Sequence, residues 1–377
     1  MIKNKTKIIL LLSFVFLLSA CKPAWEIEVF EDGRNNAGVI NQESVEFYIT
    51  NYQEETNEIP LGQMLYDVGY TLVDEITFKS DSDSSITYIW DEIGETAVIQ
   101  GSGEITLKDG TKILPDQIEI EAPSISNYYS IMDIAPTIAY AMEWPPLPDA
   151  MGEVRVTHSG NWEYAVVILL DGLQYGKLED LINSGALPFL EQLEMLRKGI
   201  TVYPPITTSS TAAFLTSTTP QKNGVYGYSN RSTEKLTLFD VAAQENLEVI
   251  AVEGHSLAFN LRNAETILSG DRDENGFTND NVFENSLEVI RSDMPDLLYI
   301  HFHDIDDIGH QYGPFSPEYE TAIIQVDSYL EEIFTRLPEV TLITIFADHG
   351  MHKTEDGGNH GTLTAADLII PIIFIEK

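Results

Sequence analysis

The chain has 377 residues, 43% of them hydrophobic, which is enough for one large core or two smaller ones. Its formal charge of −39 repels nucleic-acid polymers and anionic lipid headgroups, so no nucleic-acid partner is expected; solubility or a salty medium would also favour such acidity. The lone cysteine, Cys21, excludes an intrachain disulfide framework and a thiolate metal cluster. Any metal site must therefore use Asp, Glu and His.

The N-terminus has the shape of a secretory signal. A basic start, "MIKNKTK", precedes the apolar stretch "IILLLSFVFLL", which is too short to span a bilayer comfortably, and "LSAC" follows. Residues 18–21 resemble a bacterial lipobox, so we expect residues 1–20 to be cleaved and Cys21 to anchor an extracytoplasmic protein to the membrane through a lipid. The alternative is an ordinary signal peptide with a chance cysteine. Cleavage removes three lysines and takes the formal charge to −42.

Residues 21–122 predict a small antiparallel β-rich domain. Short runs such as "ITYIW", "TAVI", "EITL" and "IEIE" alternate with turn signals such as "KDGTK" and "SDSDSS". No chemistry is recognisable there, so an accessory or spacer module is expected.

From about residue 160 the pattern changes to buried-strand runs separated by helical stretches. We expect strands at 165–170, 248–252, 297–302, 340–346 and 367–375, and helices over 187–199 and 316–337. Strands that alternate with helices predict an α/β domain, here residues 123–377, with a mostly parallel sheet sandwiched by helices.

Polar side chains follow several of these strands. The strand ends continue into Asp171-Gly172, Glu253-Gly254-His255, the stretch "HFHDIDDIGHQYGP" from His301, and Asp348-His349. Ligands of open α/β sheets bind beyond the carboxyl ends of the strands, so these residues are expected to share one rim. Six of the eight histidines fall between residues 301 and 360.

Carboxylates and imidazoles without thiolates suit Zn, Mn or Fe, and two such ions can hold both oxygens of a phosphoryl transfer. A nucleophile would be needed as well. The segment 203–227, "YPPITTSSTAAFLTSTTPQKNGVYG", is rich in hydroxyl groups. On composition alone it is typical of a Ser/Thr-rich loop with several helix caps.

The motifs together resemble the alkaline phosphatase superfamily, specifically its type I phosphodiesterase and nucleotide pyrophosphatase branch. That branch has a strand ending in Asp-Gly, then F-P-x-x-T with T-G nine and Pro thirteen residues later, D-x-x-G-H-x-x-G-P, D-H-G-M and Gly-x-His-Gly. Here "LLDG", "YPPIT", "DDIGHQYGP", "ADHGM" and "GNHG" occur in that order over roughly 160–377.

The resemblance implies a role for each matching residue. Thr207 would be the nucleophile and would bind the first of two divalent ions, most simply Zn, with Mn or Fe as alternatives. The other implied ligands are Asp171, Asp348 and His349 at the first ion and Asp306, His310 and His360 at the second. Metal coordination would activate the Thr207 hydroxyl, which is a poor nucleophile at its own pKa.

The chain departs from the family pattern in the substrate region. Many members have Asn three residues after the nucleophile, where this chain has Ser210, a shorter donor that we expect to contact the phosphoryl oxygen. The usual T-G is Thr216-Ser217, and the usual H-G is Asn223-Gly224. These departures bear on substrate preference more than on metal binding.

The segment 130–154, "SIMDIAPTIAYAMEWPPLPDAMGEV", resembles the helix and Pro-rich turn that normally close this catalytic domain. Here it precedes Asp171, so we expect a circularly permuted domain whose last helix is supplied from the N-terminal side. The alternative is a fortuitous amphipathic helix in a linker.

Other polar residues are given lesser roles. Residues 271–280 contain D-x-D-x-N-G, but Val282 stands where a calcium loop needs Glu, so a polar loop is favoured over a calcium site. Glu253 and His255 could line the pocket. The remaining acids and imidazoles are expected to be supporting, structural or solvent-facing: Asp304, Asp307, His301, His303 and His352.

The function expected from the resemblance is hydrolysis of a small phosphorylated substrate, a phosphodiester or nucleotide pyrophosphate, through a phosphothreonine. A phosphomonoesterase or phosphonate hydrolase is the alternative on the same metals. A silent lipoprotein that binds a phosphorylated ligand or a metal is the third candidate.

Overall fold

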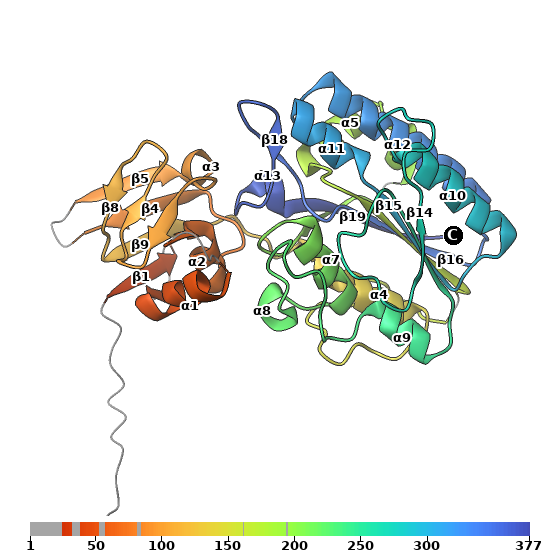
Figure 1. The fold of residues 1–377 in the computed structure, drawn as a ribbon, viewed down its shortest axis with the longest axis horizontal. Coiled ribbons are helices and arrows are strands. Elements are labelled where there is room, and N and C mark those ends of the chain that lie inside the picture. The colour runs from red at the N-terminus through yellow and green to blue at the C-terminus, as the bar shows by residue number, and fades with distance from the viewer. Residues whose placement is uncertain (1–24, 32–37, 53–56, 81–83, 161, 194) are drawn as a thin grey trace, which may run out of the picture.

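The computed structural model describes residues 25–31, 38–52, 57–80, 84–160, 162–193 and 195–377. The expected signal segment and Cys21 lie outside these residues. The described chain forms a smaller β-rich region up to Glu121 and a larger α/β region from Tyr129 onward (Figure 1). Among the described residues, no helix has the length and apolar character needed to cross a membrane.

The small region contains two sheets. The first has the order β2-β1-β9-β4-β5 and the second the order β3-β6-β7-β8. Their strands are β1 (Glu26–Glu31), β2 (Gly38–Asn41), β3 (Glu58–Pro60), β4 (Glu75–Lys79), β5 (Ser85–Ile89), β6 (Val98–Gln100), β7 (Ile105–Thr106), β8 (Lys112–Ile113) and β9 (Gln117–Glu121), and its helices are α1 (Gln42–Tyr52), α2 (Leu61–Asp67) and α3 (Trp90–Ile93). The pair β1 and β9 is parallel, so the first sheet is mixed and not purely antiparallel as expected.

The large region is built on an eight-stranded sheet with the order β10-β12-β19-β16-β11-β15-β13-β14. Its strands are β10 (Tyr129–Ser130), β11 (Tyr164–Leu170), β12 (Arg197–Ile200), β13 (Val249–Glu253), β14 (Glu265–Leu268), β15 (Leu297–Phe302), β16 (Thr341–Phe346) and β19 (Ile369–Glu376). Only β19 runs antiparallel to its neighbours, and every residue of β15 and β16 is buried. These strands have both faces covered, as parallel strands in α/β folds do, which confirms the expected fold class.

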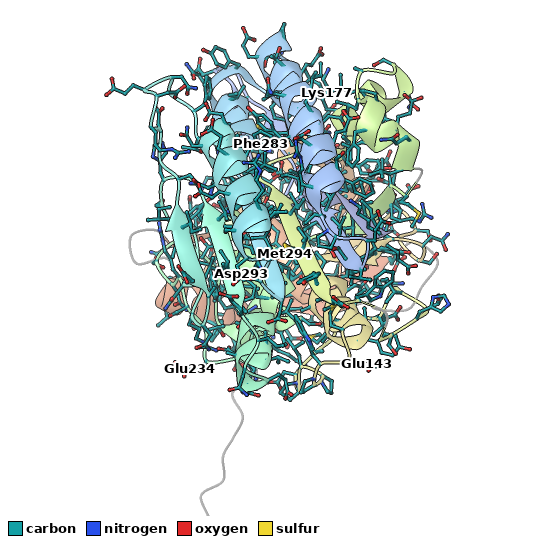
Figure 2. All side chains as sticks on the ribbon, turned by 90° about the vertical axis from the view of Figure 1, so that its right-hand side faces the viewer. Glu143, Lys177, Glu234, Phe283, Asp293 and Met294 are labelled. Carbon is teal, nitrogen blue, oxygen red and sulfur yellow. The ribbon has the colours of Figure 1, made fainter. Side chains whose placement is uncertain are left out.

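Helices cover both faces of this sheet (Figure 1). One face carries α5 (Tyr175–Asn183), α6 (Pro188–Leu193), α10 (Asn279–Ser292), α11 (Asp304–Tyr312) and α12 (Pro317–Arg336). The other carries α4 (Ile134–Ala141), α7 (Thr207–Thr216) and α9 (Leu238–Gln244), and the short pieces α8 (Pro220–Asn223), α13 (Ala365–Leu368), β17 (His352–Lys353) and β18 (Gly358–Asn359) lie in loops. Figure 2 shows α10 and α12 side by side, where Phe283 stacks on Tyr329 with ring centroids 4.4 Å apart.

Two local expectations were wrong. The helix expected over 187–199 ends at Leu193, and Arg197–Ile200 instead forms the strand β12. This segment pairs with β19, and the absence of a side chain at Gly199 permits the close approach, since a Cβ there would clash with Ile372. The hydroxyl-rich stretch expected as a loop contains α7, every residue of which is buried. Its hydroxyl groups therefore face the interior, where each needs a partner or a ligand.

The segment 130–154 packs within the large region. The strand β10 pairs with β12, which pairs with β19, and the Tyr129 ring lies 6.3 Å from that of Phe374. The Ser217 hydroxyl donates to the Met132 carbonyl at 2.7 Å, which ties the short helix η1 (Ile131–Asp133) to the end of α7. These contacts place the segment close to strand 369–376; circular permutation stays a prediction.

The small region shares a core with the loops of the large one. Ile200, Tyr203, Leu363 and Leu368 of the large region pack into the hydrophobic cluster of the small one. The Tyr66 and Tyr203 rings lie 5.7 Å apart, and the fully buried Trp90 donates its Nε1–H to the Leu363 carbonyl at 2.7 Å. The small region is therefore packed against the large one and is not a detached spacer.

A Trp90→Phe substitution tests this contact. It leaves the buried Leu363 carbonyl without a donor and opens a small cavity, so the free energy of unfolding should fall by about 2–4 kcal/mol. Urea denaturation measures the loss. Trp25→Phe is the matched control, because its Nε1 donates to Gly101 within the small region and is only partly buried. We call the contact between the small and large regions the seam. An equal loss of stability in the two variants would contradict a contribution of the seam beyond that of a contact within the small region.

Candidate active site

The expected site residues converge at the carboxyl ends of the central strands. Asp171 follows β11, Asp348 and His349 follow β16, and His301 lies near the end of β15. Thr207 is the first residue of α7, and Asp306 and His310 belong to α11, which begins two residues after β15. Residues from distant parts of the chain thus meet because parallel strands end at the same edge.

The first group surrounds the Thr207 hydroxyl. Thr207 Oγ1 lies 3.5 Å from Asp171 Oδ1 and 3.3 Å from His349 Nε2. His349 Nε2 is also 3.4 Å from Asp171 Oδ1 and 3.5 Å from Asp348 Oδ2. Ligand atoms of Asp171, Asp348 and His349 all lie within 4.8 Å of one another, which is close enough to hold one ion.

The second group surrounds Asp306. Its Oδ2 lies 3.3 Å from His310 Nε2, and its Oδ1 lies 3.7 Å from His360 Nε2. The His360 ring stacks on His349 with centroids 3.7 Å apart, and His349 can share an ion with Asp306 and His360. The two groups are therefore adjacent, and His349 lies between them.

The histidine tautomers fit metal ligands. His310, His349 and His360 each place Nδ1 within 3.1 Å of a backbone carbonyl, of Gly358, Gly350 and Pro205 respectively. A carbonyl accepts only from a protonated Nδ1, so each Nε2 faces the carboxylates and can bind a metal. Among the described residues, Asp348 Oδ2 and Asp306 Oδ1 are buried oxygens without a hydrogen-bond donor. Divalent ions would satisfy both oxygens.

The unliganded cluster has shifted pKa values. Burial and the charge of Asp171 raise the pKa of Asp348 to about 7. Burial lowers the pKa of His349, but Asp348, Asp171 and Asp306 outweigh it and raise that pKa to about 9. Burial and the neighbouring His349 charge lower the pKa of His360 to about 4. The negative charge that holds a proton on His349 would equally attract a metal ion.

Metal affinity should therefore rise with pH. Below about pH 9 an ion must displace the proton of His349, so affinity for Zn²⁺ should increase about tenfold per pH unit between about pH 7 and 9 and then level off. Below about pH 7 the slope should steepen, because Asp348 holds a second proton. Competition of chelator-stripped protein against a zinc-binding dye measures this. An affinity that stays flat from pH 7 to 9 would contradict the assignment of His349 as a ligand.

A tight turn after β11 brings the two groups together. Gly172 has φ +68°, and a Cβ there would lie 2.5 Å from Asp306 Oδ1, so no side chain fits between Asp171 and Asp306. The buried Tyr319 of α12 donates its hydroxyl to the Gly172 carbonyl at 2.6 Å and accepts from the Gln174 N–H at 2.8 Å. The Asp-Gly pair is thus explained by the close approach of α11.

A further cluster lies on the far side of Asp171. Both His301 and His303 contact Asp171 Oδ2 and the buried Glu253, and their rings lie 3.6 Å apart. Asp171 and Glu253 outweigh burial and raise the pKa of both imidazoles. The sequence suggested only that Glu253 could line the pocket; its position at the end of β13 was the available signal.

The other acids of "HFHDIDDIGHQYGP" have separate places. Asp304 is buried and accepts hydrogen bonds from the Thr278 and Asn279 N–H groups at the start of α10, at 3.0 and 2.8 Å. Asp307 is an exposed residue, yet partial desolvation of its carboxyl group, together with the nearby charge of Asp306, raises its pKa. Among the described residues, neither carboxylate forms a hydrogen bond or ion pair with Nε2 of His310, His349 or His360.

Two further residues, Ser210 and Tyr228, are candidates for contact with the substrate. The Ser210 hydroxyl is buried and lies 2.9 Å from Thr201 Oγ1, so its contact with substrate stays a prediction. Tyr228, whose side chain is half exposed, was not expected here: burial of its hydroxyl and then the charges of Asp306, Asp171 and Asp348 raise its pKa. No motif marks this position.

The loop at 271–280 is closed by its own hydrogen bonds. Asp271 accepts from the Asn275 and Gly276 N–H groups at 3.0 and 2.9 Å, and the Asn275 amide donates to Asp280 at the start of α10. His352, another residue expected to be structural, bonds Asp367 at 2.8 Å.

The chain is similar to known proteins in sequence and in fold. Residues 165–369 match the family described as type I phosphodiesterase / nucleotide pyrophosphatase, and that span contains every residue of both groups. The chain is 30% identical over 106 residues to the human GPI ethanolamine phosphate transferase 3, catalytic subunit, a match that covers 28% of this chain and 9% of that protein. It is 32% identical over 102 residues to GPI ethanolamine phosphate transferase 2 of Schizosaccharomyces pombe, covering 24% of this chain and 13% of that protein.

The matched part thus spans about a tenth of the length of these curated relatives. Among solved structures, murine ectonucleotide pyrophosphatase / phosphodiesterase 5 in complex with AMP superposes with a TM-score of 0.41 at 15% identity. That superposition covers 51% of this chain and 58% of the murine one.

Proposed function

The chain belongs to the type I phosphodiesterase / nucleotide pyrophosphatase family, and from this membership we propose that it is a metal-dependent hydrolase of phosphoric esters. The preferred substrate is a small phosphodiester or nucleotide pyrophosphate. The observation that carries the proposal is the position of Thr207 Oγ1, which lies 3.3 Å from His349 Nε2 and 3.5 Å from Asp171 Oδ1.

Thr207 is well placed to bind and attack a phosphoryl group. It begins α7, a ten-residue helix whose first backbone N–H groups have no partner within the helix. The partial positive charge of a helix N-terminus favours a phosphate there. The ester would therefore bind above Thr207, with its non-bridging oxygens toward the start of the helix.

The reaction would proceed in two displacements. Thr207 Oγ1 would form a bond to phosphorus as the bond to the leaving oxygen breaks; the Thr207 proton would pass to that oxygen, and the alcohol would leave from the opposite side. Water would then attack the phosphothreonine, release the phosphate product and return the proton to Thr207. Divalent ions held by Asp171, Asp348 and His349 and by Asp306, His310 and His360 would lower the pKa of the hydroxyl and of water and neutralise the phosphoryl oxygens.

A second candidate is transfer of a phosphoryl-linked group to an acceptor hydroxyl in place of water. The curated relatives, at 30 and 32% identity, are named as ethanolamine phosphate transferases, and this observation favours it. The covalent step on Thr207 would be the same, and only the second acceptor would differ. A phosphomonoesterase or phosphonate hydrolase would use the same residues with a smaller leaving-group site.

The test compares bis-p-nitrophenyl phosphate with p-nitrophenyl phosphate, with and without chelator. We expect faster turnover of the diester, loss with chelator and recovery when Zn²⁺ is restored. Faster turnover of the monoester would favour the phosphomonoesterase. Turnover that rises with an added alcohol such as ethanolamine would favour the transferase, and no turnover of either ester with metal restored would favour a binding protein.

We also propose that the protein is an extracytoplasmic lipoprotein anchored through Cys21. This rests on the sequence of residues 1–21 alone. Globomycin, which blocks lipoprotein signal cleavage, should leave a larger precursor in a bacterial host. A Cys21→Ala variant should then lose partition into Triton X-114, whereas an anchor elsewhere would leave partition unchanged.

A further inference from the structure

We propose that the chain holds a third divalent metal ion, bound by Asp171 Oδ2, His301 Nε2 and His303 Nδ1 and separate from the two ions of the proposed reaction. His301 Nε2 lies 3.1 Å from Asp171 Oδ2, and His303 Nδ1 lies 3.5 Å from the same oxygen. The three atoms fall within 4.8 Å of one another, so one ion can contact all of them. Separations of this size are usual between ligand atoms that share one ion.

The far nitrogens of both imidazoles are held by one carboxylate. Glu253 Oε2 lies 2.9 Å from His301 Nδ1 and 2.9 Å from His303 Nε2. A carboxylate that accepts a ring N–H turns the other nitrogen, with its lone pair, toward a metal, and histidine ligands are commonly oriented in this way. Glu253 is buried, so it serves both rings at once and orients them toward Asp171.

Asp171 can belong to two metal sites because its two oxygens face different partners. Oδ1 faces Thr207 and His349 of the first group, whereas Oδ2 faces His301 and His303. A carboxylate can bridge two ions with one oxygen on each. The third ion therefore does not compete for the ligand atoms of the first.

The surroundings of the cluster are shaped for these side chains. A Cβ at Gly254 would lie 2.9 Å from His303 Cδ2, so the His303 ring fits here because residue 254 has no side chain. The His303 backbone N–H donates to Asn279 Oδ1 at 2.8 Å, which fixes the start of α11. One divalent ion also places two positive charges between the carboxylates of Glu253 and Asp171, which balances their charge.

The donor set indicates the class of ion. Two imidazoles and one carboxylate suit zinc, iron or manganese and do not suit calcium or magnesium, which prefer oxygen ligands alone. An ion here would hold Asp171 ionised and fixed in orientation. The proposed ion would bind Asp171 Oδ2, whereas Thr207 faces Oδ1. Its binding is measured as metal content, which requires no turnover.

The test counts metal ions in the full chain. Chelator-stripped protein is reloaded with ZnCl₂, freed of weakly bound metal by gel filtration, and analysed by mass spectrometry for zinc per chain. We expect three ions in the unmodified chain and two in His303→Asn. His255→Asn is the matched control, because His255 is exposed two residues after Glu253 and should leave the count at three. Anomalous diffraction at the zinc edge should place the third peak between Asp171 Oδ2, His301 and His303.

A second variant guards against misfolding. Glu253→Gln keeps the size of the side chain, and removing such an orienting carboxylate should weaken the third ion roughly 10–100-fold while two ions stay bound. Circular dichroism shows whether each variant is folded. Two ions in the unmodified chain, with the same two in His303→Asn, would overturn the third site. If the chain binds three ions but hydrolyses neither ester, the result would contradict the proposed hydrolase activity and still support the third metal site.

Discussion

Replacing Thr207 with alanine is expected to reduce turnover of a phosphodiester by at least roughly 10³-fold, the scale on which removal of a covalent nucleophile acts. The hydroxyl contacts Asp171 and His349, so alanine removes the attacking oxygen and keeps Cβ in place. Steady-state kinetics with bis-p-nitrophenyl phosphate measure the effect. A phosphothreonine trapped by acid quench should be absent from the variant.

Thr208→Ala is the matched control for this prediction. Both threonines are buried at the start of α7, but the Thr208 hydroxyl donates to the Ala258 carbonyl at 3.4 Å. Turnover should stay within about threefold of the unmodified chain. Equal losses in the two variants would point to damage to α7. A loss only in Thr208→Ala would show that Thr207 is not the nucleophile.

Replacing Asp306 with asparagine is expected to lower turnover by at least roughly 10²-fold, because it removes the charge that holds the second ion. Asp306 directs one oxygen toward His310 and the other toward His360, so the substitution removes the carboxylate that both histidines face. Zinc per chain should fall by one, and the same preparation used for kinetics gives that count. Full activity with a full metal count would exclude Asp306 as a ligand.

The same helix supplies two controls. Asp307→Asn alters the exposed neighbour and should leave metal content and turnover within about threefold. Asp304→Asn weakens the hydrogen bonds to the start of α10 and should lower the free energy of unfolding by about 1–2 kcal/mol with metal content unchanged. Three aspartates within four residues thus predict three different outcomes.

The sequence was informative where chemistry depends on local spacing. Asp171 and Asp348 could be placed together because each follows a strongly apolar strand, and parallel strands end at one edge. Thr207 could be separated from Thr208 only by its distance from Thr216 and Pro220. The structure adds the physical difference, since one hydroxyl faces the cluster and the other a backbone carbonyl.

The sequence was less informative where contacts are distant or a pattern is ambiguous. Arg197 and Lys198 suit the last turn of a helix and Gly199 a position just past its end, and only pairing with β19 makes residues 197–200 a strand. Glu253 belongs to no motif, and its meeting with His301 and His303 depends on the neighbouring positions of β13 and β15 in the sheet. The contact between Trp90 and Leu363 joins residues 273 positions apart, which local patterns cannot predict.

The seam between the two regions has a thermodynamic consequence. Leu363 and Tyr203 pack against the small region, and they stand three and four residues from His360 and Thr207. Two binding events that order the same loops are linked, and linkage is reciprocal: each strengthens the other by the same factor. Packing of the small region and binding of ions at the proposed site would both order the loops that carry Tyr203 and Leu363. Loss of the packing between the two regions would then weaken ion binding at the proposed site, and removal of the ions would weaken the packing by the same factor.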